Sequence, residues 1–562
     1  MALSREHQKL IDDGNKLFTD RAGLESFWQA SSENFYPEVA TFTGSGGLTG
    51  DFGNNLTTSY PQIVRRTLGD TLSALLRPVQ LDTNVLGVWF GIRSSRNVTG
   101  DIQAQRWLEF ATTIMRRAMY DRKAKFVRAT KEGDHFFATF GQCVISIELN
   151  RNRDTLLYRN WHLKDVVWCE NAEGDIDLVQ RKWKPTVSQL VSAFPGRVSS
   201  KVTEKLKDSP YETVECRHIV VSSEAYNERI GGKRVNAPWI SLWIDVDNKH
   251  VMEEAPKRNR IYIIPRWVTV PGSQYAVSPA VTIGLPDARL LQAMTLTTLE
   301  ASEKFANPPM IATEEAIRSD LNLLAGGTTW VDREYDEKLG EALRPLYTPS
   351  AGQGLNAAFE LGNRTEQALA KAFFLDSLSL PPATVSKEMT RYEVEQRVSE
   401  WLRRAMPIFE PMEFEYNAAI CDETFDLLMQ NGAFGSLQDI PRSLRGSETQ
   451  FKFESPLHEG AERRKGMRFM EATEALMLAS QIDPSSRHLL NVRGSMRDVL
   501  SSIVPADWQN DDAEVDKRIQ AEQQQMAMAQ MLAGGGQAAE IADKVGSAVK
   551  NVAQAQQPKK AA

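Results

Sequence analysis

The chain has 562 residues, of which 42% are hydrophobic and 25% are charged, so at roughly 150 residues per domain it should form several units with more than one core. Its 35 glycines and 25 prolines are far below the share found in collagen-like or low-complexity chains, which excludes wholesale disorder. With 66 basic and 73 acidic residues the net charge is −7, which excludes the strongly basic composition of a protein that grips nucleic acid tightly.

Neither a secretory leader nor a membrane span is expected. The N-terminal residues MALSREHQKLIDDGNK carry charges where a leader has its apolar core. The longest uncharged stretch before the Gln-rich tail, residues 267–286, is interrupted by prolines, a glycine and polar residues. It therefore lacks the ~20 predominantly apolar residues of a transmembrane helix.

The first 140 residues are predicted to be mainly helical. Apolar residues at helical spacing predict a helix over 4–36, which should end at Tyr36-Pro37 because a residue before proline disfavours helical backbone angles. Further helices are expected over 60–76 and 101–139. The intervening segment GSGGLTGDFGNN has no Lys-Ser/Thr after its glycines, so it is interpreted as a surface loop and not as a phosphate-binding loop.

The predicted helix over 101–139 is amphipathic. Trp107 and Ile114 share its apolar face, whereas Arg116, Arg117 and Arg122 lie on another face. We interpret these arginines as a solvated face, and a binding patch is the alternative.

Residues 142–270 consist of short runs rich in Val, Ile, Trp and Tyr, a composition typical of strands. Turn residues at 171–174 and at 247–248 predict that neighbouring strands form hairpins. This part of the chain should therefore be rich in β-sheet.

Two helices of similar length flank a small insert in the next part. The helical pattern resumes at Pro286-Asp287 and runs to Asn307, and a second helix is predicted from Asn356 to about Leu375. The insert, 307–356, is predicted to contain a strand at 310–312, a helix near 314–324 and a strand at 328–332. This arrangement indicates a stalk with a small unit at its far end.

The last third is predicted to be helical with one loop. A proline-containing loop precedes Thr390 and Glu393, which have the spacing of a helix capping box. Further helices should end near Gly432 and then cover 456–503, and the Gln/Ala-rich tail is either helical or disordered.

No catalytic or metal-binding constellation is present in the sequence. There is no HExxH, GxSxG, Rossmann GxGxxG or GxxxxGK[ST] motif, and the seven histidines include no i,i+4 pair. The four cysteines have neither the density of a disulfide framework nor the paired CxxC spacing of a zinc site, and they are expected to be reduced and mostly buried. They are Cys143, Cys169, Cys216 and Cys421.

Several ordered stretches resemble the portal proteins, or head-to-tail connectors, of short-tailed (podovirus-type) bacteriophages. The resemblance covers about residues 15–520. It is carried by RAGLESFWQASSENFYPE, ENAEGDIDLVQRKWKPTVSQLVSAFPG, IIPRWVTVPGSQYAVSPAVTIGLPDARLL, NPPMIA, MTRYEVEQRVSEWLRRAMPIFEPMEFE, SPLHEGAERRKGMRFMEA and IVPADWQNDDAEV. One departure is YAVSP at 275–279, where relatives tend to have Tyr-Gly-Arg before the Ser/Gly-Pro, so any role of that arginine does not carry over.

The resemblance implies an α+β portal fold with a strand-rich wing, a two-helix stem, a small α/β clip, a helical crown and a possible C-terminal helical barrel. It also implies a dodecameric ring at one capsid vertex that serves as the channel for genome packaging and ejection. The corresponding segments are 1–284 with 390–450 for the wing, 285–306 and 357–376 for the stem, 307–356 for the clip, 377–389 for a channel (tunnel) loop, 451–520 for the crown and 521–562 for a barrel helix or flexible tail.

The implied partners are other copies of the chain, the terminase motor, tail adaptor proteins, the major capsid and scaffold proteins, and duplex DNA that passes without sequence specificity. No cofactor, metal, membrane or enzymatic activity is expected, and the protein should belong to the virion after assembly in the bacterial cytoplasm. The alternative is an enzyme with an unrecognised active site in the strand-rich N-terminal region.

Two groups of candidate residues follow from these assignments. The cations Lys371, Lys387 and Arg391 are candidates for guiding DNA in the channel, with ion pairs between subunits as the alternative role. An acidic or neutral wall elsewhere would avoid the many phosphate contacts that would hold DNA in place. The candidates for the clip interface are Arg318, Asp320, Arg333 and Glu334.

Overall fold

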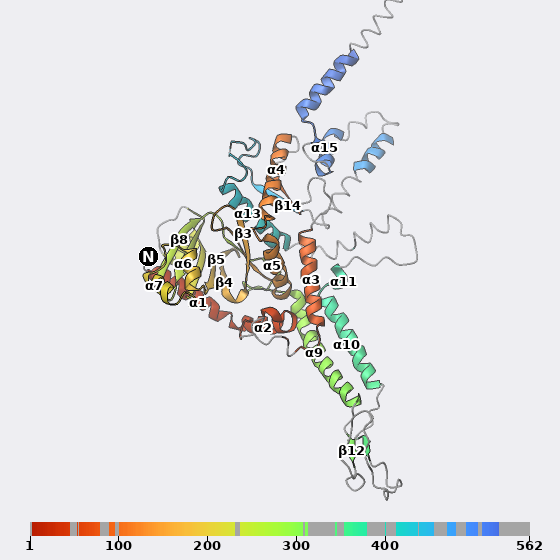
Figure 1. The fold of residues 1–562 in the computed structure, drawn as a ribbon. Helices are drawn as coiled ribbons and strands as arrows, with labels where there is room; N and C mark the ends of the chain where they lie inside the picture. The colour runs from red at the N-terminus through yellow and green to blue at the C-terminus, as the bar shows by residue number, and fades with distance from the viewer. Residues whose placement is uncertain are drawn as a thin grey trace, which may run out of the picture. The chain divides into compact units, whose positions relative to one another are not determined.

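The computed structural model combines helices with antiparallel sheets (Figure 1), and its residues divide into two compact units. The first unit comprises residues 1–89, 114–434 and 453–460, and the second comprises 90–113, 435–452 and 461–562. This mixed helix and sheet composition agrees with the predicted fold class. The structure describes residues 3–44, 53, 56–78, 89–95, 101–230, 237–306, 310–312, 343–345, 353–378, 400, 412–436, 438–453, 469–478, 491–503 and 508–527.

The single N-terminal helix predicted over 4–36 is in fact two helices, α1 (Arg5–Asp20) and α2 (Ala22–Phe35), with Arg21 between them. The Arg21 guanidinium donates hydrogen bonds to the backbone carbonyls of Leu163, Lys164 and Val166. Burial lowers the pKa of Arg21, and these carbonyls supply the polar partners that a buried guanidinium needs. The break is therefore set by a contact about 140 residues away in sequence.

The central sheet of the first unit has five strands in the order β4-β5-β6-β7-β8, and all neighbours are antiparallel. The predicted hairpin turns are confirmed: 171–174 joins β4 to β5, and 247–248 joins β7 to β8. The strands are β4 (Val166–Glu170), β5 (Ile176–Trp183), β6 (Cys216–Ser222), β7 (Trp239–Asp245) and β8 (His250–Lys257).

Helices cover both faces of this sheet. On one face, Leu10 of α1 and Tyr226 of α8 (Ser223–Ile230) pack on Leu178, Ile219 and other strand residues. On the other face, helices α6 (Val187–Ala193) and α7 (Ser200–Asp208) pack their apolar residues on Cys216 and Met252. The expectation that 142–270 is rich in β-sheet is confirmed, and these three helices lie between its strands.

A second, three-stranded sheet has the order β3-β2-β9. Its strands are β2 (Val144–Leu149), β3 (Leu156–Trp161) and β9 (Tyr262–Ile263). The Tyr262 hydroxyl on β9 is 2.5 Å from His218 Nδ1 and accepts a hydrogen bond from Arg181 Nε at 2.8 Å, and both partners belong to the central sheet. Burial lowers the pKa of His218, so this enclosed imidazole is neutral at pH 7.

Helices α3 (Tyr60–Leu76) and α5 (Phe126–Phe140) pack on each other beside this second sheet. The bounds of α3 match the predicted helix over 60–76. The predicted helix over 101–139 is interrupted, because α4 (Ile102–Met119) ends before the turn at 120–125 and α5 begins after it. The first unit also contains the π-helical turn η4 (Glu413–Ala418) and α13 (Ala419–Gln430).

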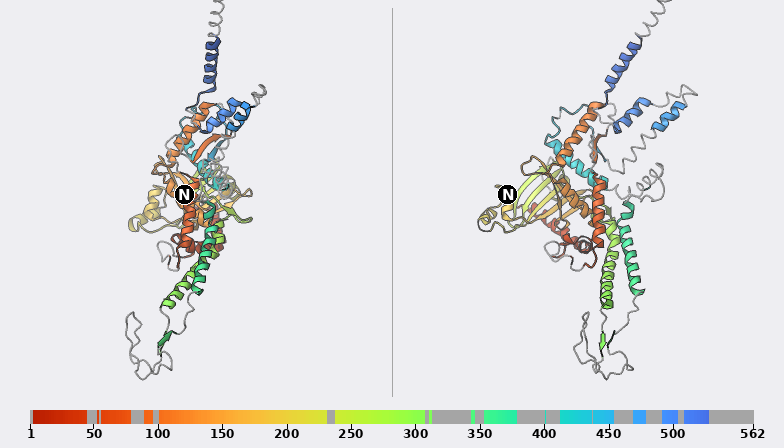
Figure 2. Two further views of the ribbon diagram at one scale, coloured as in Figure 1. Left: turned by 90° about the vertical axis from the view of Figure 1, so that its right-hand side faces the viewer. Right: turned by 45° about the vertical axis from the view of Figure 1, so that its right-hand side comes forward.

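Two helices form the stalk of the first unit and lie side by side in all three ribbon views (Figures 1 and 2). Helix α9 (Pro279–Ala306) begins seven residues earlier than predicted and includes Pro286. Helix α10 (Gln353–Ala372) is followed by α11 (Leu375–Leu378). Of the insert between α9 and α10, the predicted strand at 310–312 is confirmed as β12 (Met310–Ala312), which pairs with β13 (Leu343–Pro345).

The second unit contains the two-stranded sheet of β1 (Phe90–Ser94) and β14 (Thr449–Phe453), although Phe453 itself is grouped with the first unit. Its helices are the N-terminal part of α4, α15 (Val492–Ile503), and segments at 469–478 and 512–527. In this unit, Arg493 pairs with Asp512 and Asp516, which ties α15 to the helix over 512–527.

All four cysteines are free, and three of them are buried, as predicted. No helix within the described ranges combines the length and apolar character needed to cross a membrane.

Candidate functional site

The stalk helices pack closely because a glycine lies at their contact. A Cβ atom on Gly284 of α9 would lie 2.9 Å from Leu369 Cδ1 and 2.9 Å from Phe373 Cε2 on the other side of the contact. Both Leu369 and Phe373 are fully buried. A side chain at this position would therefore force the buried Leu369 and Phe373 side chains to shift in a closely packed contact.

The start of α9 is fixed to the body of the first unit by Ser278. Its hydroxyl donates to the carbonyl of Ala138 at 2.7 Å and accepts from the backbone N–H of Val281 at 3.4 Å. Ser278 is thus the cap of α9, which explains why the helix begins at Pro279 and not at Pro286. Because proline lacks a backbone N–H, Pro286 removes one hydrogen bond from the helix, and packing of the buried Val281 and Leu285 keeps this turn helical.

A side chain farther along α9 holds the segment that precedes α3. The Gln292 Oε1 atom accepts hydrogen bonds from the backbone N–H groups of Thr57 and Thr58 at 2.7 and 3.0 Å, and its Nε2 donates to the carbonyl of Thr58 at 3.0 Å. Phe373, after α10, packs on Phe35 of α2 with ring centroids 5.0 Å apart. Both stalk helices are therefore anchored to the N-terminal helices.

The outward sides of the stalk are apolar and exposed. No charged residue occurs in α9 between Arg289 and Glu300. In this stretch Leu290, Leu296 and Leu299 are each about half exposed, and so are Phe359 and Leu361 on α10. Exposed apolar side chains gathered along two neighbouring helices are a candidate interaction surface in a soluble protein.

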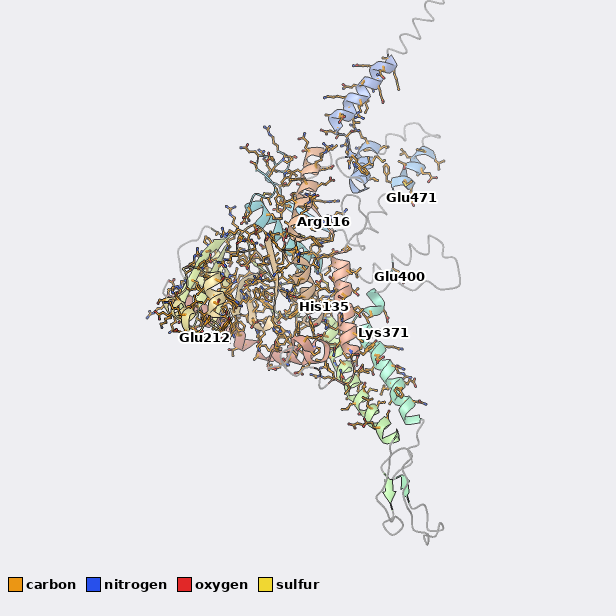
Figure 3. All side chains as sticks on the ribbon, viewed as in Figure 1. Arg116, His135, Glu212, Lys371, Glu400 and Glu471 are labelled. Atoms are coloured by element: carbon orange, nitrogen blue, oxygen red, sulfur yellow. The ribbon has the colours of Figure 1, made fainter. Side chains whose placement is uncertain are left out.

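One stripe of α10 is charged. Glu360 and Arg364 form an i,i+4 ion pair, and Lys371 lies seven residues farther along the same side of the helix. Lys371 is exposed and has no ion pair with any residue that the structure describes (Figure 3). It also lies in the last turn of α10, where the helix dipole favours a cation.

The other predicted site residues cannot be placed. Lys387 and Arg391, the capping box at Thr390 and Glu393, and the predicted elements at 314–324 and 328–332 lie outside the described residues. The same holds for the clip candidates Arg318, Asp320, Arg333 and Glu334.

A buried ion pair that the sequence did not reveal connects α3, α5 and η4. Arg77, directly after α3, pairs with Asp134 of α5 and donates to Asn417 Oδ1 at 2.9 Å, while Asn417 Nδ2 donates to the carbonyl of Leu76 at 3.0 Å. Burial alone would lower the pKa of Arg77, but the attraction of Asp134 outweighs it and holds that pKa above its ordinary value. This pair fixes the segment that returns at 412–430, and nothing in the local sequence of either residue signals it.

No group of three or more His, Cys, Asp and Glu side chains in the described ranges is placed to hold a metal ion. The Tyr262, His218 and Arg181 cluster is enclosed between the two sheets, with all three side chains at most 4% exposed, and so it presents no surface to a substrate.

Comparison with known proteins identifies relatives along most of the chain. A family model described as "Bacteriophage head to tail connecting protein" matches residues 7–503. The "Probable portal protein" of Bordetella phage BPP-1 is 24% identical over 476 residues, which cover 81% of this chain and 80% of the relative. The "Portal protein" of Salmonella phage epsilon15 is 21% identical over 459 residues, which cover 80% of this chain and 78% of the relative.

Among solved structures, a chain of the "Virion of native gene transfer agent (GTA) particle" aligns with a TM-score of 0.34 at 8% identity, and the alignment covers 75% of this chain and 86% of that one. A likeness this weak carries no argument, so the assignment rests on the sequence comparisons.

Proposed function

Because the chain belongs to the family of bacteriophage head-to-tail connecting proteins, we propose that twelve copies of it close into a ring at one vertex of the phage capsid. The role of the protein is that of a structural portal protein, and the comparisons give no support to the alternative of an enzyme. In the proposed ring, duplex DNA enters and leaves the head through the central channel.

The observation that carries the ring is the exposed apolar surface of the stalk. Leu290, Leu296 and Leu299 on α9 and Phe359 and Leu361 on α10 lie in water in the single chain. Covering the exposed half of a leucine side chain contributes about 1 kcal/mol, so a neighbouring copy on this surface stabilises the assembly. A head-to-tail contact between identical chains closes into a ring when the rotation between copies divides a full turn.

In this ring the second stem helix, α10, contributes to the channel wall. Its exposed charged stripe is nearly neutral, because Glu360 balances Arg364, and this limits the number of counterion-releasing phosphate contacts that would trap DNA. Lys371 adds a single cation that guides the duplex, and Lys387 and Arg391 are proposed to do the same farther along the chain. Ion pairs between subunits are the alternative role for each of them.

The remaining segments take the roles expected for the family. The clip, 307–356, meets the terminase during packaging and tail adaptors afterwards, with Arg318, Asp320, Arg333 and Glu334 as its interface candidates. The major capsid and scaffold proteins are further partners, and assembly takes place in the host cytoplasm. The protein uses no cofactor and does not hydrolyse ATP.

Two stalk substitutions test the ring. Leu290→Glu combined with Leu296→Glu places charge on the apolar surface, and because both side chains are exposed the isolated chain should still fold, which circular dichroism checks. Tyr211→Glu is the matched control, because Tyr211 is 84% exposed and lies just after α7, outside the stalk. In sedimentation velocity we expect rings from the wild type and the control and only small species from the stalk variant, and rings from the stalk variant would contradict the proposal.

A further inference from the structure

A basic surface lies in the first unit outside the stalk. It is formed by the end of α4, the turn at 120–125, the start of α5 and the turn between β2 and β3, and all of its cations are exposed (Figure 3 labels Arg116). This basic surface consists of Arg116, Arg117, Arg122, Lys123, Lys125, Arg128 and Arg153. In a chain of net charge −7, such a concentration of cations is a marked local exception.

The carboxylates within this region hold its turns and leave most of the cations unpaired. Asp121 accepts a hydrogen bond from the backbone N–H of Lys123 at 2.7 Å. The side chain of Asn150 donates to Asp154, and this bond, together with the weaker attraction of Lys123, lowers the pKa of that carboxyl. Lys123 also pairs with Asp154, and Arg128 pairs with Glu132, but such exposed pairs contribute little.

Five of the seven cations have no ion pair with any residue in the described part of the chain. They are Arg116, Arg117, Arg122, Lys125 and Arg153.

Local helix stability does not account for most of these residues. Arg116 and Arg117 are in the last turn of α4, where the helix dipole favours them. Lys125, however, is the N-cap of α5, makes no side-chain capping bond and has φ 57°, and Arg128 lies in the first turn, where a cation is disfavoured. Arg153 also has φ 57°, a conformation that is uncommon for residues other than glycine.

Aromatic side chains pack together beneath the basic surface. Phe126 packs against Tyr158 and Tyr120 with ring centroids 5.0 and 5.3 Å apart, and Trp89 Nε1 donates to the Tyr120 hydroxyl at 3.1 Å. The backbone N–H of Tyr158 donates to the carbonyl of Ala124 at 2.9 Å, which joins strand β3 to the turn at 120–125. The cations are therefore carried by a backbone that is already ordered, which lowers the entropy lost on binding.

We propose that this basic surface binds the phosphate backbone of duplex DNA without sequence specificity, as a contact separate from the stalk. The proposal rests on the proposed function, in which the protein handles the phage genome. Five of the seven cations are arginines, whose planar forks match phosphate oxygens. The acidic remainder of the chain would repel DNA and so confine it to this surface.

The composition of the surface favours DNA over an acidic protein segment. A protein interface needs an apolar centre, and the exposed apolar groups here are confined, within the described residues, to Val127 and the edge of Tyr120. In the sequence, Arg116, Arg117 and Arg122 are interpreted as one solvated helix face, whereas in the structure Arg122 lies in the turn after α4. The structure adds Lys125, Arg128 and Arg153 from neighbouring segments.

The test measures binding of the full-length protein to covalently closed circular duplex DNA, which cannot thread through a closed ring. The variant R117Q/R122Q removes two of the unpaired cations, K201Q/K207Q removes two exposed lysines of α7 as a charge-matched control, and R117K/R122K keeps the charge. Because each phosphate contact contributes about 0.9 to the slope of log K against log salt, we expect R117Q/R122Q to reduce that slope by about 1.8. The control and the lysine variant should leave the slope close to wild type.

Equal slopes for R117Q/R122Q and the control would overturn the proposal. The proposal would also be overturned if polyglutamate competed for the surface as well as unlabelled DNA does, at the same salt and the same concentration of charges. That result would favour an acidic protein partner. Electron microscopy of the same samples shows whether rings form, so a failure of DNA binding in intact rings is distinguishable from a failure of the ring itself.

Discussion

Replacing Asp134 with asparagine should destabilise the first unit strongly. The side chains of Asp134 and Arg77 are 0% and 4% exposed, and the substitution leaves the Arg77 guanidinium buried without a compensating charge. Removing one partner of a buried ion pair typically costs about 3–5 kcal/mol, and the remaining acceptor, Asn417 Oδ1, is uncharged. We therefore expect Asp134→Asn to lower the free energy of unfolding by this amount.

Urea unfolding of the unassembled chain, followed by tryptophan fluorescence, measures this loss. Glu132→Gln is the control, because the Arg128–Glu132 pair on the same helix is exposed and should contribute less than about 1 kcal/mol. Replacing both partners, Arg77→Met with Asp134→Leu, should be less destabilising than Asp134→Asn alone, because no charge remains buried. A loss of 1 kcal/mol or less for Asp134→Asn, or a double variant that is no more stable, would refute the reasoning.

Three further predictions concern pH, the stalk contact and the channel. Burial raises the pKa of Glu423 to about 7, and the attraction of Arg260 only partly opposes this. Ionisation of Glu423 therefore destabilises the folded state as pH rises from 4.5 to 7. The variant Glu423→Gln should be about 3 kcal/mol more stable than wild type above pH 8 and equally stable below pH 4. Urea unfolding curves that show no such pH dependence would refute this. Gly284→Ala should lower the melting temperature, because its Cβ would collide with Leu369 and Phe373. Gly362→Ala has open space around its Cβ, so it should raise the melting temperature by removing a helical glycine. Shifts of the same sign for both variants would contradict the packing at Gly284. Charge reversal at Lys371 should reduce the DNA packaged per head in a phage assay, and normal packaging and retention would remove Lys371 from the channel candidates.

Sequence patterns correctly predicted the elements that are set by interactions between residues close together in the chain. The helix over 60–76, the strand at 310–312 and the hairpin turns at 171–174 and 247–248 needed only periodicity and turn residues, and each is confirmed. The composition of 142–270 does not single out α6 and α7, because the surrounding strands dominate it, although a local signal is present. Thr186 and Gln189 form a capping box at α6, and this Thr-x-x-Gln spacing can be seen in the sequence.

Other features depend on contacts distant in sequence and so could not be predicted. The break at Arg21 is set by carbonyls near residue 165, and Arg77 meets Asp134 and Asn417 only after three segments have packed. The early start of α9 follows from Ser278, which bonds to the carbonyl of Ala138. Of the candidate site residues, Lys371 is found exposed on α10 as a channel role requires, and its role stays a prediction.

End-on electron microscopy of the purified full-length protein at high concentration shows directly whether the chain assembles into a ring. We predict closed rings with a central hole, and rotational averaging should show twelve subunits. Particles that remain small at every concentration tested, with the chain folded, would contradict ring assembly.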